Sequence, residues 1–174
     1  MITVRAFDAG EARQRRDELS GLLQDAVEGG ASIGFVLPLA PGEAEDYWQS
    51  VVEAIGTGRR KLLAALLDER IVGAVQLDLE PRANGRHRAE IMKLMVGRAH
   101  RRRGIGRDLM RAALDQASAA GRSLLLLDVR AGDPAEALYR SLGFVRFGEV
   151  PRHARSPDGR LAATSFWFLE LPPG

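Results

Sequence analysis

The sequence predicts a mixed α/β fold in which strands and helices alternate around one sheet. Apolar residues recur at helical spacing in several segments, and short apolar runs of strand length lie between those segments. Gly, Pro and Asn-Gly positions separate the two kinds of segment. The resulting order, βααβββαβαββ, places an antiparallel meander before a βαβα unit. A chain of 174 residues has the length of one ordinary domain, so we expect a single domain over 1–174.

The first half of the chain is expected to contain one strand, two helices and then three strands. Leu19, Leu22 and Leu23 form part of a helical stripe that ends at Gly29-Gly30. Asp68-Glu69-Arg70 and Asn84-Gly85 fit tight turns between strands. The expected elements are a strand at 3–7, helices at 11–27 and 42–55, and strands at 61–67, 71–79 and 88–96.

The second half begins with the strongest helix of the sequence, over 105–120, which Gly121 ends. A nearly all-apolar strand at 124–129 is typical of a sheet centre. A short helix at 134–142 starts with proline and ends at Gly143, and strands at 144–150 and 165–171 complete the chain. The long segments 29–41 and 151–164 are expected loops, where substrate contacts are common.

Composition excludes several classes of function. The chain has no cysteine, so it has no disulfide, thiolate metal site or cysteine nucleophile, and a cytoplasmic location is allowed. No apolar run approaches the length of a membrane span, and the N-terminus has no apolar signal region. The three histidines show no metal-ligand spacing. Of the 25 basic residues only Lys61 and Lys93 are lysines, and the arginine-rich background makes isolated arginines uninformative.

One basic, glycine-rich stretch carries clear chemical information. Arg101, Arg102 and Arg103 are followed by Gly104-Ile105-Gly106 at the start of the helix over 105–120. The first backbone N–H groups of a helix have no intrahelical partner and lie at the positive end of its dipole. Glycine lets an anion approach that backbone closely, and arginine side chains add charge around it. This stretch therefore predicts a pyrophosphate cradle.

Two common phosphate motifs do not fit this cradle. The chain contains no P-loop string, and Leu109 stands where a dinucleotide fingerprint requires its third glycine. Instead, the run Leu94-Met95-Val96, the cradle and a following helix resemble the GCN5-related N-acetyltransferases. The family's second signature, Ala135, Tyr139 and Gly143-Phe144, follows in the right order. Arg98 departs from the pattern, because it stands where the family commonly has proline.

The resemblance extends to the subgroup of tabtoxin-resistance acetyltransferases. The stretches that carry this finer likeness are 29–35, 88–96 and 156–161. The resemblance implies the fold of the GCN5-related N-acetyltransferases (GNAT), in which the two central parallel strands splay apart and admit the pantetheine arm of acetyl-CoA. The implied cofactor-binding residues are the backbone of Leu94, Met95 and Val96, and the cradle formed by Arg101, Arg102, Arg103, Gly104, Ile105 and Gly106.

Acetyl transfer to an amine requires a neutral amine, a polarised carbonyl and a proton for the leaving thiolate. The resemblance assigns the general acid to Tyr139, although a core tyrosine is the alternative. Asp128 interrupts an apolar strand, so we expect a buried carboxylate with an upward pressure on its pKa, acting as general base or as an anchor for the amine. A structural ion pair is the other role open to it.

Glu90 is the second candidate base, on a strand where the family often carries one. Strict alternation of side chains would place Glu90 on the same face as Met92 and Leu94. A surface charge near Arg88 is the alternative role for Glu90.

The sequence as a whole predicts an acetyl-CoA-dependent enzyme that acetylates the primary amine of a small molecule, of amino-acid-like or antibiotic type. Acetylation of peptides or proteins, and a non-catalytic acyl-CoA sensor, are the alternatives. Nucleic-acid binding through the arginine run is disfavoured because no aromatic residues interleave with it. We expect no metal and no membrane partner, and a homodimer through the strand at 165–171 is a further hypothesis.

Overall fold

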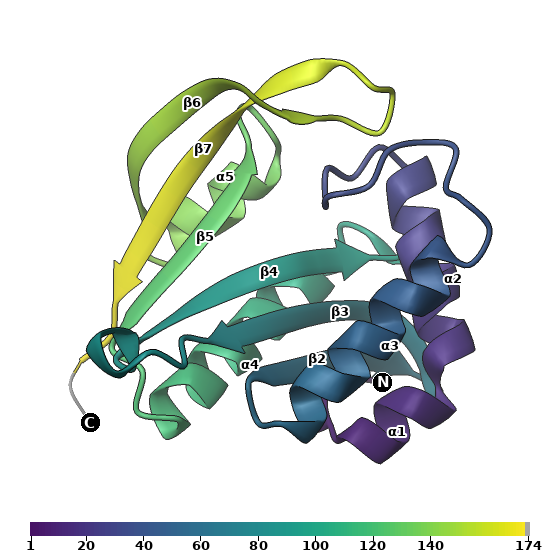
Figure 1. Cartoon of the computed structure of the whole chain (residues 1–174), viewed down its shortest axis with the longest axis horizontal. Coiled ribbons are helices and arrows are strands. Elements are labelled where there is room, and N and C mark those ends of the chain that lie inside the picture. Colours follow the sequence, from purple (N-terminus) through teal and green to yellow (C-terminus); the bar gives the residue numbers. More distant parts are fainter. Residues whose placement is uncertain (173–174) are drawn as a thin grey trace.

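A computed structural model describes residues 1–172 and contains one seven-stranded sheet (Figure 1). The strands follow the spatial order β1-β2-β3-β4-β5-β7-β6, and only β4 and β5 are parallel neighbours. The elements are β1 Ile2–Phe7, α1 Ala9–Gln14, α2 Arg16–Glu28, α3 Glu43–Gly56, β2 Arg60–Leu67, β3 Arg70–Leu79, β4 Arg88–Val96, α4 Ile105–Ala119, β5 Leu124–Arg130, α5 Ala135–Ser141, β6 Val145–Arg155 and β7 Leu161–Glu170. The mixed α/β fold class is confirmed.

The predicted helix over 11–27 is two helices, α1 and α2, which meet at Arg15. Arg15 has a non-helical ψ of 19°, and its guanidinium binds both Glu18, at 2.8 Å, and the carbonyl of Glu69 in the turn between β2 and β3. The Asp8 side chain caps α1 by accepting a hydrogen bond from the backbone N–H of Glu11 at 2.8 Å. Tertiary contacts of Arg15 therefore interrupt a pattern that is continuous in the sequence.

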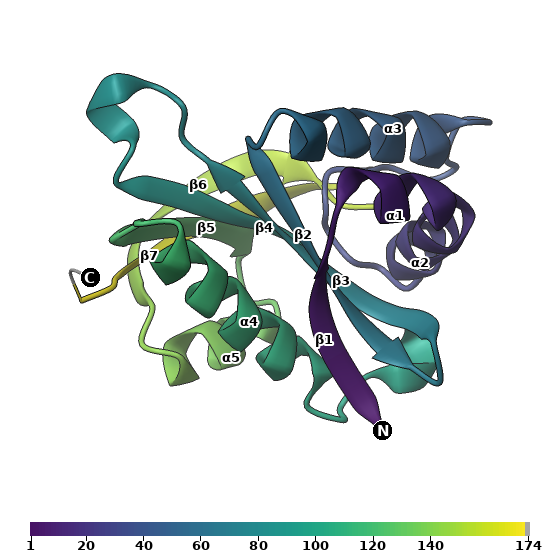
Figure 2. The same ribbon diagram turned by 90° about the horizontal axis from the view of Figure 1, so that it is seen from below.

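Helices cover both faces of the sheet (Figure 2). α1, α2 and α3 lie on one face, hereafter the front, where Trp48 and Leu23 are fully buried. α4 and α5 lie on the back, where α4 buries its stripe of Ile105, Leu109 and Met110. Burying each such side chain contributes about 1.5–3 kcal/mol. Among residues 1–172, no helix is both long and apolar enough to cross a membrane.

α4 approaches the sheet closely at Gly73 of β3. A Cβ at Gly73 would lie 3.0 Å from Leu109, 3.1 Å from the Met95 carbonyl and 3.2 Å from Ile105. Glycine is therefore required for this contact. The contact holds the first turn of α4, where the predicted cradle lies, directly behind the C-terminal part of β4.

The two parallel strands separate after a short paired segment. β4 and β5 pair only from Arg88–Leu124 to Glu90–Leu126 and then diverge, as Figure 1 shows. Backbone groups of β4 that face β5 beyond Glu90 have no strand partner there. The splayed central pair expected from the sequence is thus present, and it opens a cleft through the sheet.

Candidate active site

The cleft between β4 and β5 holds a cavity of about 350 Å³. It brings together three elements that are distant in the sequence: β4, β5 with the start of α5, and the tip of the β6–β7 hairpin. The loop after α2 closes the remaining side. Its chemically relevant lining residues are Glu90, Lys93, Leu94, Asp128, Arg130, Tyr139 and His153.

β4 contains a β-bulge that changes which face its side chains occupy. Ala74 pairs with Met95 but Gln76 pairs with Met92, so β4 has one extra residue, and Lys93 has a positive φ of 55°. Ala89, Ile91 and Leu94 all pack into the core on the back of the sheet. The expectation that Glu90 and Leu94 share a face is therefore wrong, because the bulge reverses the alternation between them.

Glu90 and Asp128 are diagonal neighbours on the front of the sheet. Glu90 pairs with Leu126, and Asp128 is the next residue of β5 on the same face. Glu90 is half-buried, and this burial, with repulsion from Asp128 and Asp78, raises the pKa of its carboxyl above the ordinary value. Neither carboxylate forms an ion pair or hydrogen bond within residues 1–172.

The burial predicted for Asp128 is wrong. Its strand neighbour Leu127 is buried in the back core, whereas Asp128 itself is exposed on the open side of the splay. The apolar sequence around it reflects burial of one face of β5 only. Glu90, the second candidate, is thus the carboxylate with the desolvated environment that the sequence suggested for Asp128.

Tyr139 lies on α5 at the back of the cleft. Its ring packs against Phe144 and Trp167, with centroids 6.1 and 6.4 Å away, and only 6% of the residue is exposed. Its hydroxyl has no hydrogen-bond partner among residues 1–172, although it lines the cavity. Burial, together with the negative charges of Asp133 and Asp128, raises the pKa of Tyr139, so the phenol stays protonated at neutral pH. A protonated phenol can donate to a developing anion.

Lys93 is a cleft residue that the sequence analysis missed. The bulge directs its side chain to the front, where the ammonium donates to the Ile33 carbonyl and lies 5.7 and 5.8 Å from the ring centres of Phe35 and Tyr47. No carboxylate among residues 1–172 lies within ion-pair distance of it. Only two of the 25 basic residues are lysines, and the rarity of lysine was the only signal in the sequence.

The predicted cradle has the backbone geometry of an anion site. Gly104 is the residue before α4 and has a φ of +83°, and Arg102 has a φ of +62°. The N–H groups of Gly104, Ile105 and Gly106 have no hydrogen-bond partner within residues 1–172, and no side chain caps the helix. Consecutive free N–H groups around left-handed residues form an anion-binding concavity. A pyrophosphate fits this donor set.

The side chains around the cradle divide into outward and inward groups. Arg102 and Arg103 are exposed beside the free N–H groups, whereas Arg101 folds back and donates to the Val96 carbonyl at 3.2 Å. Met95 and Ile105 are buried in the front and back cores, so any part they play in binding is through their backbone.

Arg98, at the position where the family commonly has proline, ties the preceding loop to α2. Its guanidinium and its backbone N–H each donate to Asp25 at 2.7 Å. The loop that leads into the cradle is therefore anchored by a side chain instead of by a proline ring.

The predicted loop over 29–41 is present, but the predicted loop over 151–164 is wrong. β6 runs to Arg155 and β7 begins at Leu161, because the two strands stay paired almost to the turn, so only 156–160 connect them.

The two connecting segments touch each other. The backbone N–H of Leu37 donates to the Pro157 carbonyl at 2.8 Å. Arg130 lies below this contact and reaches Asp133 at 3.2 Å and the Ser156 hydroxyl at 3.4 Å. Leu37, Pro157 and Arg130 line a separate hollow of about 270 Å³ beside the cleft, so this contact joins the two segments next to the cavity between β4 and β5.

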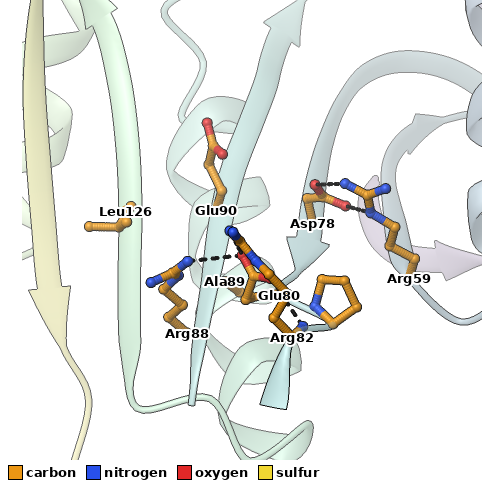
Figure 3. Close-up of a pocket in the computed structure, with 9 residues that line it drawn as sticks. Arg59, Asp78, Glu80, Arg82, Arg88, Ala89, Glu90 and Leu126 are labelled. Carbon is orange, nitrogen blue, oxygen red and sulfur yellow. Dashed lines mark hydrogen bonds and ion pairs between the residues drawn. The ribbon is translucent and has the colours of Figure 1, made fainter. Parts of the chain in front are cut away.

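A second hollow, of about 470 Å³, lies on the front of the sheet at the base of the splay (Figure 3). Two of its three carboxylates are paired: Glu80 binds Arg82 at 2.7 Å and Arg88 at 3.0 Å, and Asp78 binds Arg59 at 3.2 Å. Glu90 lines both cavities, and Figure 3 shows its carboxyl directed away from the Glu80 cluster. We call this region the paired hollow. Within residues 1–172 no cluster of three or more His, Asp or Glu is arranged to hold a metal ion.

Comparison with known proteins gives a consistent result. The sequence model of the Acetyltransferase (GNAT) family matches residues 35–144. An uncharacterized N-acetyltransferase encoded in the hisH-hisA intergenic region of Azospirillum brasilense is 33% identical over 132 residues, covering 74% of this chain and 76% of that protein.

Solved structures share the fold at low sequence identity. A candidate acetyltransferase from Salmonella typhimurium, whose structure contains acetyl-CoA, has a TM-score of 0.82 at 19% identity and covers 100% of this chain and 96% of its own. The ribosomal-protein-alanine N-acetyltransferase from Brucella melitensis has a TM-score of 0.79 at 24% identity, with coverage of 97% and 99%. The chain therefore belongs to the acetyltransferase (GNAT) family, acyltransferases for which acetyl-CoA is the cosubstrate.

Proposed function

We propose that this protein transfers the acetyl group of acetyl-CoA to the primary amine of a small molecule by direct attack, in the cleft between β4 and β5. One observation carries the proposal: Tyr139, Glu90 and Asp128 line one cavity, and the free backbone donors of Gly104 to Gly106 lie at the start of α4, behind the C-terminal part of β4, the strand that forms one wall of that cavity. Acetyl-CoA would supply the activated thioester. The roles that follow belong to the chain's own residues.

Gly104, Ile105 and Gly106 hold the pyrophosphate through their N–H groups, with Arg102 and Arg103 beside them. The unpaired backbone of β4 around Leu94, Met95 and Val96 binds the pantetheine arm as an added strand would. Tyr139 gives a proton to the departing thiolate, since its pKa is raised and it stays protonated at neutral pH.

Glu90 is the general base in this proposal and Asp128 anchors the incoming ammonium. A raised pKa brings Glu90 closer to neutral pH, where a general base is most effective. Asp128 is exposed at the open side of the splay and is free to pair with a charged amine before that amine loses its proton.

The acceptor that best fits the cavity carries both an amine and an acidic group. Glu90 and Asp128 suit the amine, while Lys93 is a cation with no carboxylate partner within residues 1–172 and suits an anion. This bipolar lining supports the amino-acid-like acceptor and the tabtoxin-resistance subgroup, with detoxification of an antibiotic or toxin as the role. A single domain over 1–174, a cytoplasmic location and a homodimer through the strand at 165–171 complete the proposal.

Acetylation of peptides or proteins is the second candidate. The loop after α2 lines the cavity through Ile33 and Gly34, and the hydrogen bond from Lys93 to the Ile33 carbonyl holds it there, so a peptide chain would have to pass this loop to bring its N-terminus to Glu90. This loop therefore favours a small acceptor.

Calorimetry with acetyl-CoA tests the cofactor site. Gly104→Asp places a carboxylate in the cradle and should abolish binding, because it repels the pyrophosphate. Gly121→Asp is the matched control: Gly121 follows the other end of α4, also has a positive φ, at 68°, and also has open space around it. Equal loss in both variants would assign the effect to backbone strain and reject the cradle.

A panel of paired amines tests the acceptor. Each amino acid is compared with the same amine lacking its carboxylate, in wild type and in Lys93→Gln. We expect Lys93→Gln to raise KM about tenfold for the carboxylated member only, because a charged hydrogen bond is lost. Tight acetyl-CoA binding without acetylation of any amine or peptide would instead support the non-catalytic sensor.

A further inference from the structure

Lys93 has an environment that no other amine of the described chain shares. The chain contains two lysines, and the second, Lys61, pairs with Leu77 on the back of the sheet and does not line the cleft. Arginine cannot replace lysine as an acyl acceptor, because its guanidinium stays protonated. The presence of a lone lysine at the β4 bulge therefore places one ε-amine inside an acetyltransferase cleft.

The surroundings of the Lys93 ε-amine are apolar on one side and polar on the other. Phe35 and Tyr47 cover it from the front, and its only hydrogen bond within residues 1–172 is to the Ile33 carbonyl. A Cβ on Gly34 would lie 2.8 Å from its nitrogen, so the loop after α2 closes tightly over it. The amine is held by one neutral acceptor and by no carboxylate.

Three charged groups face Lys93 from the adjoining strands. Arg60 of β2 repels its ammonium, whereas Glu90 of β4 and Asp128 of β5 attract it. Burial is the largest influence and, with Arg60, it outweighs the two carboxylates and lowers the pKa of the Lys93 amine below the ordinary value. A larger fraction of Lys93 is therefore neutral, and nucleophilic, at physiological pH.

We propose that Lys93 is a self-acetylation site: when no acceptor occupies the cleft, its ε-amine takes the acetyl group from acetyl-CoA. The inference rests on the proposed function, because it requires the thioester to lie beside β4 at Leu94, the residue after Lys93. The flexible four-carbon stem lets the nitrogen leave the Ile33 carbonyl and turn into the cavity that Lys93 already lines.

The chemistry is the same transfer with a different amine. The neutral Nζ of Lys93 attacks the thioester carbonyl, a C–N bond forms and the C–S bond breaks. Nζ loses one proton, which Glu90 can accept, and the leaving sulfur gains one, which Tyr139 can donate. The products are an amide on Lys93 and free CoA thiol, so atoms and protons balance.

The amide is stable, so acetyl-Lys93 is an end product that changes the cleft. Acetylation removes the cation that suits an anionic acceptor and adds bulk beneath the loop after α2. A bound acceptor works in the opposite sense: its anion keeps Lys93 protonated, and its own amine occupies the position of attack. Self-acetylation should therefore occur mainly when the acceptor is scarce.

Mass spectrometry after incubation with acetyl-CoA alone tests the proposal. We expect wild type to gain the mass of one acetyl group at Lys93, more than about tenfold faster than at Lys61. Trypsin cannot cut after acetyl-lysine, so modification appears as an intact 89–98 peptide. Lys93→Arg keeps the charge and should remove the product, and Lys61→Arg should not. Gly104→Asp should prevent modification because it removes the cofactor site.

A second readout uses the protein without acetyl-CoA. Trace labelling with acetic anhydride at several pH values reports how readily each lysine loses its proton. We expect the reactivity of Lys93 to reach half its maximum below pH 10.5, the ordinary lysine value. A midpoint at or above that value would overturn the proposal.

The remaining outcomes separate the two proposals. If acetyl-CoA binds and small amines are acetylated while Lys93 stays unmodified, self-acetylation is rejected and the proposed function stands. Equal rates at Lys61 and Lys93, or undiminished modification in Gly104→Asp, would show adventitious chemical acetylation and also reject it. If wild type fails to bind acetyl-CoA, the proposed function fails first and this inference fails with it.

Discussion

The cleft and the paired hollow lie on either side of Glu90 and are built from the same residue types, yet their charges are arranged differently. In the paired hollow, Glu80 has two arginine partners and Asp78 contacts both Arg59 and Arg60. In the cleft, Glu90 and Asp128 have no ion-pair partner within residues 1–172.

The difference teaches that the pairing of the charges, rather than the presence of a cavity, distinguishes the two regions. A carboxylate that is already paired gains little by binding a ligand, since an existing ion pair must be broken first. The unpaired, partly buried charges of Glu90 and Lys93 are costly to the folded protein and are available to an acceptor. We therefore expect catalysis to depend on the cleft and stability to depend more on the paired hollow.

The largest effect should come from Tyr139, which has no counterpart in the paired hollow. Tyr139→Phe removes the hydroxyl but keeps the ring that packs against Phe144 and Trp167. We expect kcat to fall about 100-fold, the scale of lost general-acid catalysis, with acetyl-CoA affinity and Tm nearly unchanged. Steady-state kinetics and calorimetry check this. A kcat within twofold of wild type would mean that the thiolate leaves without help from Tyr139.

Glu90 and Glu80 provide a matched pair for the next test. Glu90→Gln should lower kcat/KM about tenfold or more, because it removes the proposed base. Glu80→Gln changes the same residue type on the neighbouring wall and should alter kcat/KM by less than about twofold. An equal loss of activity in both variants would contradict the distinction between the two regions, since the paired hollow would then belong to the site.

The pH dependence of kcat/KM provides a further test of the role of Glu90. Glu90 must be deprotonated to act, and its pKa is raised above the ordinary 4.5. The ratio of wild-type to Glu90→Gln kcat/KM should therefore fall as the pH drops through that raised pKa. Taking the ratio cancels the ionisation of the acceptor amine. A ratio that is constant with pH would show that Glu90 does not act by its ionisation.

Sequence reasoning predicted the elements that depend on local pattern. Gly104 and the helix after it, the apolar strand of β5 and the α5 signature around Tyr139 are all local, and each lies at the predicted place. The family resemblance added the splay of β4 from β5, which no local pattern indicates.

The errors in the prediction arise where tertiary contacts override the helical or strand periodicity of the sequence. Lys93 adopts a positive φ without being glycine, so the bulge that reverses β4 has no sequence signal. The burial of Asp128 was overestimated because β5 is covered on one face only. Arg15 divides one helical pattern through its contact with Glu69, a residue 54 positions away. Each error assigned a side chain to the wrong face of the sheet or to the wrong environment.

The smallest expected effect is a change in Tm when a glutamate is replaced by glutamine, and this change has opposite signs in the cleft and in the paired hollow. A glutamate whose pKa is raised in the folded state destabilises the protein at any pH above that pKa, because the folded state disfavours the charge. Glu90→Gln should therefore raise Tm at pH 7, by about 2 °C. The gain should shrink as the pH falls towards 4.5, where Glu90 becomes protonated in both states.

Glu80→Gln should instead lower Tm slightly at pH 7, by no more than about 2 °C, because its ion pairs with Arg82 and Arg88 hold its pKa well below the ordinary range. The loss should persist at pH 4 and disappear only in strong acid, since a carboxylate with a lowered pKa contributes its full stability above its unfolded pKa and loses it as the pH falls towards its folded pKa. Calorimetric scans of the two variants at pH 4 and 7 test both signs. A fall in Tm for Glu90→Gln at pH 7 would show that Glu90 has a stabilising partner, and its assignment as an unpaired base would be wrong.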